Sequence, residues 1–324
     1  MKRRTILRSS ALSLTLSHIA PFTQAQTRLT GPIKIVVAWP AGGFVDVVIR
    51  ALADKLSKDL GTPIIVENKT GAYGLIGAEQ VINSAPDGRT WLIGTLGTPM
   101  SANLYKRKWV AADELAGVSM VANSPLIAVV PSSVPATDIK QFIELLRSQP
   151  GKFNYLNPSI GSASHLNVEL IKLRSGVSIT SVLYNGQPPG MADLIAGQTH
   201  FGLLAPYVVA PHIRSGKLRA IAVAFNERLH DFPDVQTLAE AGYPEADAVA
   251  SYSVLVPKRT PREVISRFNA DIGRALSDPE TRRRIEGAGA IVAQPSTPEM
   301  VDAFIRSETL RWDKFFRETR ITID

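Results

Sequence analysis

The sequence predicts an α/β protein made of two similar halves, because the same order of strands and helices occurs twice along the chain. Unbroken apolar runs of strand length alternate with segments whose apolar residues recur every three to four positions. The unbroken runs are typical of parallel sheets covered on both faces, and the longer period is typical of the covering helices. A chain of 324 residues exceeds one average domain, so we expect two domains, each with its own core.

The first half begins with the strand IKIVVAW at residue 33. The small-residue loop PAGG follows, and then a helix in which Val48, Leu52 and Leu56 recur at every fourth position. Gly61 ends this helix. The segments TPIIVEN, IGAEQVINSA and TWLIGT then predict a strand, a helix and a third strand, which completes a βαβαβ unit.

The second half repeats this plan from about residue 125. The strand SPLIAVVP precedes a helix that carries four apolar residues on one face, at Ile139, Phe142, Ile143 and Leu146. The segments that follow predict a strand, a loop, a helix, a strand, a helix and a strand, in the order FNYLNP, SIGSAS, HLNVELIKL, ITSVLYN, GMADLIAG and THFGLL. The halves therefore share an architecture without a letter-for-letter repeat.

The last third of the chain supplies the strand YSVLVP and several helices. We predict that three helices of the chain begin at side-chain caps, at Thr137, Thr260 and Ser277. A final helix from Thr297 should pack on the first half through Val301, Phe304, Ile305, Trp312 and Phe316. Residues 26–124 plus 252–324 are therefore predicted to form a discontinuous lobe 1, and residues 125–251 a lobe 2. Two crossing strands form the predicted hinge, beside a central cleft.

The first 25 residues predict a cleaved export signal, and hence a periplasmic protein. A basic start at Lys2, Arg3, Arg4 and Arg8 precedes a short apolar run and then the small residue Ala25. The paired arginines are compatible with both the general and the twin-arginine export routes, which stay open. The signal holds four basic residues and no acid, so cleavage lowers the formal net charge of +7 to about +3.

Several function classes are excluded by composition and spacing. No segment is apolar enough for the roughly 20 residues of a membrane span, and no basic stripe interleaved with aromatics indicates nucleic-acid binding. The chain has no cysteine, and its five histidines show no metal-ligand spacing. Nucleotide-binding glycine motifs are missing. An exported hydrolase with Ser162 near His165 stays an alternative, although the G-x-S-x-G pattern is missing; loss of ester turnover in Ser162→Ala would support it. We predict no enzyme, no cofactor and no metal.

Two loops have the form of an anion site, because each combines small residues with an immediately following helix. They are the segment Trp39, Pro40, Ala41, Gly42, Gly43 after the first strand, and the segment with Ser159, Gly161, Ser162 and Ser164 in the second half. If both face one cleft, their amides and the serine hydroxyls bind a carboxylate without Arg or Lys. Thr95 and Thr98 are further candidates, and so is Asp46, for which a structural role at the helix start is the alternative. Each loop alone is equally compatible with a tight strand-to-helix turn.

Seven blocks of sequence carry a resemblance to a known family: IKIVVAWPAGGFVD, IIVENKTGAYGLIGAE, APDGRTWLIGT, GKFNYLNPSIGSASHL, YNGQPPGMADLIAGQ, PHIRSGKLRAIAV and FPDVQTLAEAGYP. In this order they resemble the Bug receptors, the substrate-binding subunits of tripartite tricarboxylate transporters. The resemblance implies a two-lobed type II periplasmic-binding-protein fold and a small organic carboxylate held by backbone groups of the two loops. It also implies a monomer that works with two membrane subunits from separate genes, or with a sensor protein.

Departures from the family pattern make the predicted cleft more apolar. Trp39 stands where Phe is usual, Phe44 precedes Asp46, Tyr73 replaces a habitual Gly, and Leu204 stands where many members carry Asp. These residues, and His165 at the start of the second loop's helix, complete the candidate ligand contacts. We therefore expect a monocarboxylate with an apolar or aromatic body, whose burial contributes about 25 cal/mol per Å². The alternative is that these side chains pack on each other and say nothing of the ligand.

Overall fold

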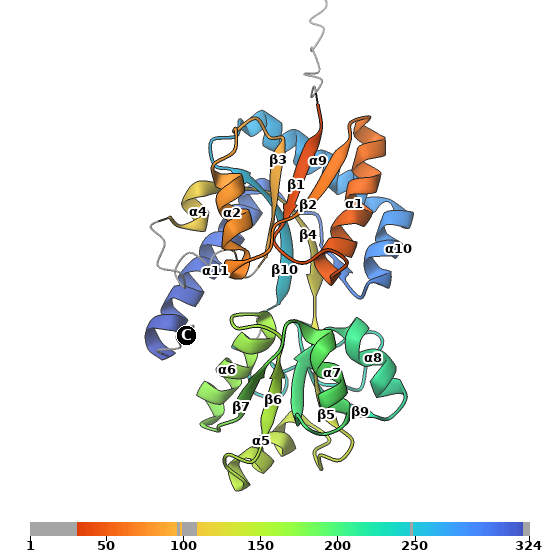
Figure 1. Cartoon of the computed structure of the whole chain (residues 1–324), viewed down its shortest axis with the longest axis vertical. Coiled ribbons are helices and arrows are strands. Elements are labelled where there is room, and N and C mark those ends of the chain that lie inside the picture. The colour runs from red at the N-terminus through yellow and green to blue at the C-terminus, as the bar shows by residue number, and fades with distance from the viewer. Residues whose placement is uncertain (1–30, 96–97, 99–108, 247–248, 320–324) are drawn as a thin grey trace, which may run out of the picture. The chain divides into compact units, whose positions relative to one another are not determined.

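The computed structural model describes residues 31–95, 98, 109–246 and 249–319, so the predicted export signal lies outside the described residues. The described chain contains two β-sheets with helices packed around them (Figure 1). We call the part built on the six-stranded sheet lobe 1 and the part built on the five-stranded sheet lobe 2. The predicted two-lobed α/β fold is therefore present.

Lobe 1 has its strands in the order β11-β4-β10-β3-β1-β2. These strands are β1 (Ile33–Val37), β2 (Ile64–Asn68), β3 (Thr90–Gly94), β4 (Leu115–Ser124), β10 (Ala250–Pro257) and β11 (Ile291–Val292). Its helical segments are α1 (Phe44–Leu60), η1 (Ala72–Gly74), α2 (Leu75–Ile82), α4 (Ala111–Glu114), α9 (Arg262–Ser277), α10 (Pro279–Gly287) and α11 (Pro298–Thr319). The buried apolar run of β1 lies inside the sheet, between β3 and β2, as the unbroken pattern predicts.

Lobe 2 has its strands in the order β7-β6-β8-β5-β9. These are β5 (Leu126–Pro131), β6 (Asn154–Asn157), β7 (Thr180–Leu183), β8 (Phe201–Leu204) and β9 (Leu218–Ala224). The helices are α5 (Ile139–Ser148), α6 (Ala163–Ser175), α7 (Gln187–Ile195) and α8 (Pro206–Arg214). The apolar face of α5 is buried in the core of this lobe, together with β5 and β6.

Both sheets are mixed, whereas the sequence analysis expected mostly parallel ones. The pairs β1–β2, β1–β3, β6–β7 and β6–β8 are parallel, but β10 runs antiparallel to β3 and β4, and β5 runs antiparallel to β8 and β9. The reason is the path of the chain between the lobes. Strands β1, β3, β6 and β8 lead into the loops between the lobes, whereas β5 and β10 start there and run away from them, so they oppose their neighbours.

Helix α11 packs on both lobes (Figure 1). Its first half places Val301 and Ile305 in the apolar core of lobe 1. Its second half places Trp312 and Phe315 in the apolar core of lobe 2, and Arg311 donates to the backbone carbonyl of Glu245 at 2.9 Å. The sequence analysis assigned this helix to lobe 1 alone. A helix of 22 residues is about 33 Å long, which is enough to reach both cores.

Candidate ligand-binding site

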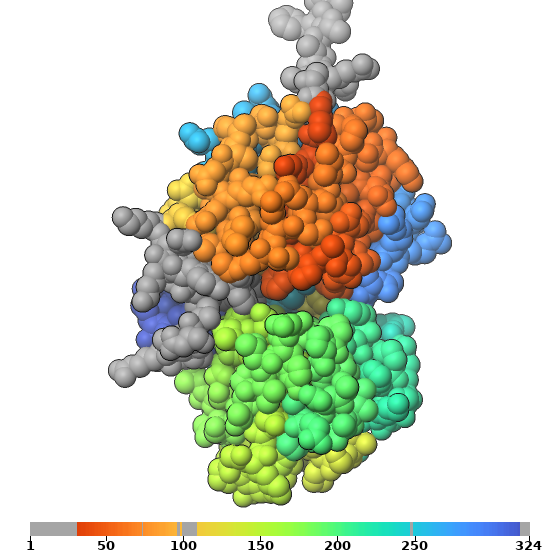
Figure 2. Space-filling model, in the orientation of Figure 1, coloured from red at the N-terminus to blue at the C-terminus, as the bar shows by residue number. Residues whose placement is uncertain are grey.

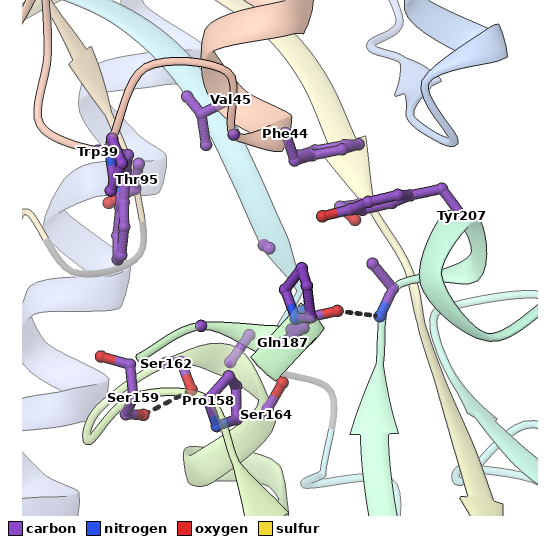
Figure 3. Close-up of a pocket in the computed structure, with 18 of the residues that line it drawn as sticks. Trp39, Phe44, Val45, Thr95, Pro158, Ser159, Ser162, Ser164, Gln187 and Tyr207 are labelled. Carbon is purple, nitrogen blue, oxygen red and sulfur yellow. Dashed lines mark hydrogen bonds between the residues drawn. The ribbon is translucent and has the colours of Figure 1, made fainter. Parts of the chain in front are cut away.

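A cavity of about 680 Å³ lies where loops of the two lobes meet. Figure 2 shows the groove between the red and orange atoms of lobe 1 and the green atoms of lobe 2. Lobe 1 contributes the end of β1 and the start of α1, and lobe 2 contributes the starts of α6, α7 and α8 (Figure 3). The carboxyl ends of parallel strands lead into these helices, which is the expected place for a ligand in an α/β sheet.

The first loop, Trp39–Gly43, is a tight turn into α1. Gly42 has a φ of 74°, a conformation that favours glycine, and the Gly43 amide donates to the Pro40 carbonyl at 3.2 Å. Helix α1 begins at Phe44, and Gly43 precedes it without a side-chain cap. The first amides of a helix have no acceptor within the helix, so those of Phe44 and Val45 remain available beside the cavity.

Asp46 holds this loop in place and does not line the cavity, which agrees with the structural role at the helix start that the sequence analysis gave as the alternative to a ligand contact. Its side chain is only 3% exposed, and it accepts hydrogen bonds from the Gly42 amide at 2.9 Å, Arg50 Nε at 2.8 Å and Asn68 Nδ2 at 3.0 Å. Asn68 Nδ2 also donates to the Trp39 carbonyl at 2.9 Å. Burial raises the pKa of Asp46, but the bonds from Arg50, Gly42 and Asn68 outweigh it and hold the pKa below its ordinary value.

The second loop, Ser159–Ser164, is fixed by its own hydrogen bonds. Ser162 caps α6, because its Oγ accepts from the His165 amide at 3.2 Å while donating to the Ser159 carbonyl at 2.7 Å. The Ser159 amide donates to Asn157 Oδ1 at 3.1 Å. The amides of Ala163 and Ser164 come next in the first turn of α6, where a helix offers them no acceptor. These two amides and the Ser159 hydroxyl are the donors that the second loop offers at the cavity.

His165 positions the second loop from behind. Its Nδ1 accepts a hydrogen bond of 2.8 Å from the Gly161 amide, so Nε2 carries the proton of the neutral ring. Burial lowers the pKa of His165, and the effect of Lys172 adds to it, against the opposing charge of Glu169. His165 is buried and does not line the cavity, contrary to the prediction. The Gly161 amide is also used internally and does not face a ligand.

Helices α7 and α8 form a wall that the sequence analysis missed. Gly186 precedes α7, and Gln187 Oε1 accepts from the Ala205 amide at 2.9 Å, which leaves Gln187 Nε2 as a donor (Figure 3). Ala205 precedes α8, whose residue Tyr207 also lines the cavity. The signal was available, because these helices follow β7 and β8 at the same sheet edge that the rule for strand ends singles out.

Aromatic rings border the cavity. Phe44 of α1 stacks on Tyr207 of α8 with ring centroids 5.2 Å apart and an interplanar angle of 12°. Tyr252 of β10 lies behind them, 5.7 Å from Phe44. Burial raises the pKa of Tyr207 and of Tyr252, so both phenols are neutral at physiological pH. Figure 3 shows Trp39 on the opposite side of the cavity from Phe44 and Tyr207.

The structure separates the predicted contacts into two groups. Those at the cavity are Trp39, Pro40, Ala41, Gly42, Gly43, Phe44, Thr95, Ser159, Gly161, Ser162 and Ser164. Leu204 is instead fully buried in the core of lobe 2, contrary to the prediction. Thr98 is also buried and is not a lining residue, although its Oγ1 accepts from the amide of the lining residue Thr95 at 3.0 Å. The side chain of Tyr73 lies outside the described part of the structure.

The cavity has no charged side chain among the described residues that line it. The helix N-termini of α1, α6, α7 and α8 border it instead, and each carries a partial positive charge from the peptide dipoles. Neutral donors and helix N-termini suit a single anionic group that needs no counter-charge. The apolar and aromatic side chains around them suit an uncharged remainder.

The arrangement of the described residues at the second loop and elsewhere bears on catalysis and on metal binding. Ser162 Oγ contacts the amide of His165, while the imidazole Nδ1 is occupied by the Gly161 amide, so the two side chains do not form a nucleophile–base pair. Within the described ranges, no group of three His, Cys, Asp or Glu side chains is arranged to hold a metal ion. None of the helices in these ranges has the length and apolarity of a membrane span.

The sequence of this chain is similar to those of known proteins. The sequence profile of the tripartite tricarboxylate transporter family receptor matches residues 48–321. The chain is similar to Protein BugT of Bordetella pertussis (strain Tohama I), with 33% identity over 98% of both chains. These two findings agree with the resemblance that the seven sequence blocks carry.

Solved structures of periplasmic proteins are similar to this chain as well. The fold is similar to that of a periplasmic transporter, with a TM-score of 0.79, 30% identity, and coverage of 91% of this chain and 99% of that one. It is also similar to MatC of Rhodopseudomonas palustris with bound malate (TM-score 0.76, 28% identity, coverage 88% and 99%). A further R. palustris protein, with adipate, has a TM-score of 0.77 and 28% identity, with coverage of 89% and 97%. These neighbours are binding and transport proteins.

Proposed function

Because this chain belongs to the tripartite tricarboxylate transporter receptor family, we propose that it is a periplasmic solute-binding receptor for a small carboxylate. The observation that carries the proposal is a cavity bordered by four helix N-termini and by no charged side chain among the described residues. Such a site stabilises one negative charge through amides and dipoles. The malate and adipate of the two R. palustris neighbours are carboxylates as well.

The carboxylate would bind between donors from both lobes. Lobe 2 offers the amides of Ala163 and Ser164, the Ser159 hydroxyl and Gln187 Nε2, and lobe 1 offers the first amides of α1. Since neither lobe holds all of these donors, binding free energy favours the arrangement in which both reach the ligand. No residue is assigned a catalytic role, and no cofactor or metal is needed.

We propose further that the ligand is a monocarboxylate with an apolar or aromatic body. Two of the departures from the family pattern, Trp39 and Phe44, lie at the cavity, and Tyr207 and Tyr252 add aromatic area. A second carboxylate would find no cationic side chain among the described lining residues. Each 100 Å² of apolar ligand surface that these groups cover contributes about 2.5 kcal/mol.

Calorimetric titration tests both the general and the specific proposal. The purified chain is titrated with benzoate, hexanoate, adipate, malate and citrate under the same conditions. We expect the apolar acids to bind most tightly. Tight binding of citrate without any response to benzoate or hexanoate would contradict the ligand class, and no response to any acid would contradict the receptor proposal itself.

Uptake is the proposed role of this binding, through two membrane subunits encoded by separate genes. A strain without this gene should lose uptake of the bound acid, measured with a radiolabelled sample, and regain it when the gene is restored. If uptake persists and only a transcriptional response to the acid is lost, the alternative role as a periplasmic sensor is favoured. The export signal and the monomeric state remain predictions, which N-terminal sequencing and light scattering on the secreted protein test.

A further inference from the structure

Phe44 and Tyr207 make a direct aromatic contact between the two lobes. Phe44 is the first residue of α1 in lobe 1, and Tyr207 lies in the first turn of α8 in lobe 2. Their rings are stacked with centroids 5.2 Å apart, and Tyr252 supports Phe44 from the buried strand β10 at 5.7 Å. Figure 3 shows the two rings one above the other at one side of the cavity.

The backbone of lobe 1 approaches Tyr207 from a second direction. Gly289 follows α10, and a Cβ at this position would lie 3.0 Å from Tyr207 Cβ and 3.3 Å from its backbone nitrogen. Gly287 and Ala288, just before it, line the cavity together with Phe44 and Tyr207. Tyr207 therefore lies between α1 and the segment after α10, although it is still 41% exposed.

We propose that Phe44 and Tyr207 form an interlobe contact that keeps this side of the cavity closed and selects ligands whose non-carboxylate end packs on the two rings. Stacked aromatic pairs add stabilisation beyond the area that they bury, yet one such pair is weak enough to separate when the lobes open. The carboxylate donors are backbone amides, a serine hydroxyl and Gln187 Nε2, whereas the pair presents two aromatic side chains. The rings therefore contact the body of the ligand, and the helix N-termini bind its charge. The selectivity part of this inference rests on the proposed function, and the contact between the lobes does not.

The contact is tested first without any ligand. The chain has no cysteine, so the exposed residues Lys58 of lobe 1 and Lys217 of lobe 2 can be replaced, as Lys58→Cys and Lys217→Cys, and spin-labelled. Pulsed electron–electron double resonance then gives the distribution of distances between the two labels, and hence the populations of short and long interlobe distances. Tyr207→Ala should lower the ratio of the short-distance to the long-distance population by roughly two- to tenfold, the range of one aromatic pair.

Matched variants separate the contact from a general loss of structure. Tyr207→Phe keeps the stack and should keep the wild-type populations, and Leu173→Ala removes an exposed apolar side chain of lobe 2 far from the cavity as a control. Phe44→Ala should have the effect of Tyr207→Ala, and the double variant should add little to either. If Tyr207→Ala fails to fold, Tyr207→Leu, which keeps the apolar volume without the ring, takes its place. Populations unchanged by Tyr207→Ala or Tyr207→Leu, or effects of the two sites that simply add, would overturn the contact.

The selectivity is tested with benzoate and acetate as probes. Phe44→Ala and Tyr207→Ala should weaken benzoate by about tenfold more than acetate, because the loss of the interlobe contact affects both acids whereas acetate has no body to reach the rings. An equal loss for both acids would overturn the selectivity. If neither acid binds the wild-type chain, the proposed function fails, while the distance measurement still decides the interlobe contact.

Discussion

Replacing Ser159 by Asp should strongly weaken carboxylate binding without disturbing the fold. Ser159 lies at the cavity, and its backbone is fixed on both sides, since its amide donates to Asn157 Oδ1 and its carbonyl accepts from the Ser162 amide and hydroxyl. No hydrogen bond joins the Ser159 hydroxyl to another described residue. A new side chain therefore changes the charge at the cavity and leaves the turn intact.

The size of the effect follows from the distance between the two carboxylates. Two unit negative charges about 5 Å apart repel by about 3 kcal/mol at an effective dielectric constant of about 20. This repulsion weakens Kd by roughly 200-fold. The Asn side chain has almost the same shape as that of Asp but carries no charge. The Kd of Ser159→Asn should therefore stay within about threefold of the wild-type value.

Calorimetry with benzoate measures the two variants, and thermal unfolding confirms that both keep the wild-type Tm within a few degrees. The expected result is a large loss for Ser159→Asp and a small one for Ser159→Asn. Wild-type affinity in the Asp variant would refute the placement of the ligand's negative charge at the second loop. Equal losses in both variants would refute the electrostatic reasoning.

Three further predictions concern the groups that hold the site and the lobes. Asp46→Ala removes the acceptor of the Gly42 amide, and should lower the free energy of unfolding by about 3 kcal/mol in urea and weaken benzoate binding. His165 has a pKa below its ordinary value of 6.5. Its contribution to stability is therefore complete above pH 6.5 and is lost as pH falls through the pKa of the folded state. Because protonation removes the acceptor of the Gly161 amide, the affinity for benzoate should fall over the same pH range. Trp312→Ala should cost about 3–5 kcal/mol in urea, because this 1% exposed side chain fills the core of lobe 2.

Each of these predictions has its own control. Asp46→Ala with unchanged benzoate affinity would show that the first loop does not depend on the carboxylate. Burial also lowers the pKa of His200, so this residue serves as the control. His165→Gln must flatten the pH dependence of affinity, while His200→Gln leaves it unchanged. Leu310→Ala, on the same helix as Trp312 but 64% exposed, should change stability by less than about 0.5 kcal/mol. An equal cost for Leu310→Ala and Trp312→Ala would contradict the packing of α11 on lobe 2.

The local elements of the fold were predictable, because apolar runs and helical periods are local properties. The strand at residue 33 and the helix after it lie where the sequence places them. Three helix starts were predicted one residue early. The residues that directly precede α5, α9 and α10 are Asp138, Pro261 and Asp278. The predicted caps were their neighbours Thr137, Thr260 and Ser277. Two neighbouring residues are often both suitable caps, and the backbone conformation decides between them.

Long-range features were not predictable in the same way. The direction of β5 and β10 depends on how the chain passes between the lobes. The burial of Trp312 in the core of lobe 2 depends on how far α11 extends beyond lobe 1. Leu204 was placed at the cavity, but it is the last residue of β8, where the alternation of side chains turns it into the core. Tyr207 reaches the cavity through a contact with the other lobe, which no pattern within its own segment indicates.

The comparison of an acid with its uncharged amide tests the central claim most directly. Benzoate and benzamide, or the tightest-binding acid of the titration series and its primary amide, share one shape and differ in the negative charge. If helix N-termini and neutral donors hold a carboxylate, calorimetry should show the acid binding about 100-fold more tightly, as expected when charge-assisted hydrogen bonds are lost. Equal affinities for the two compounds would show that the cavity recognises only the apolar body.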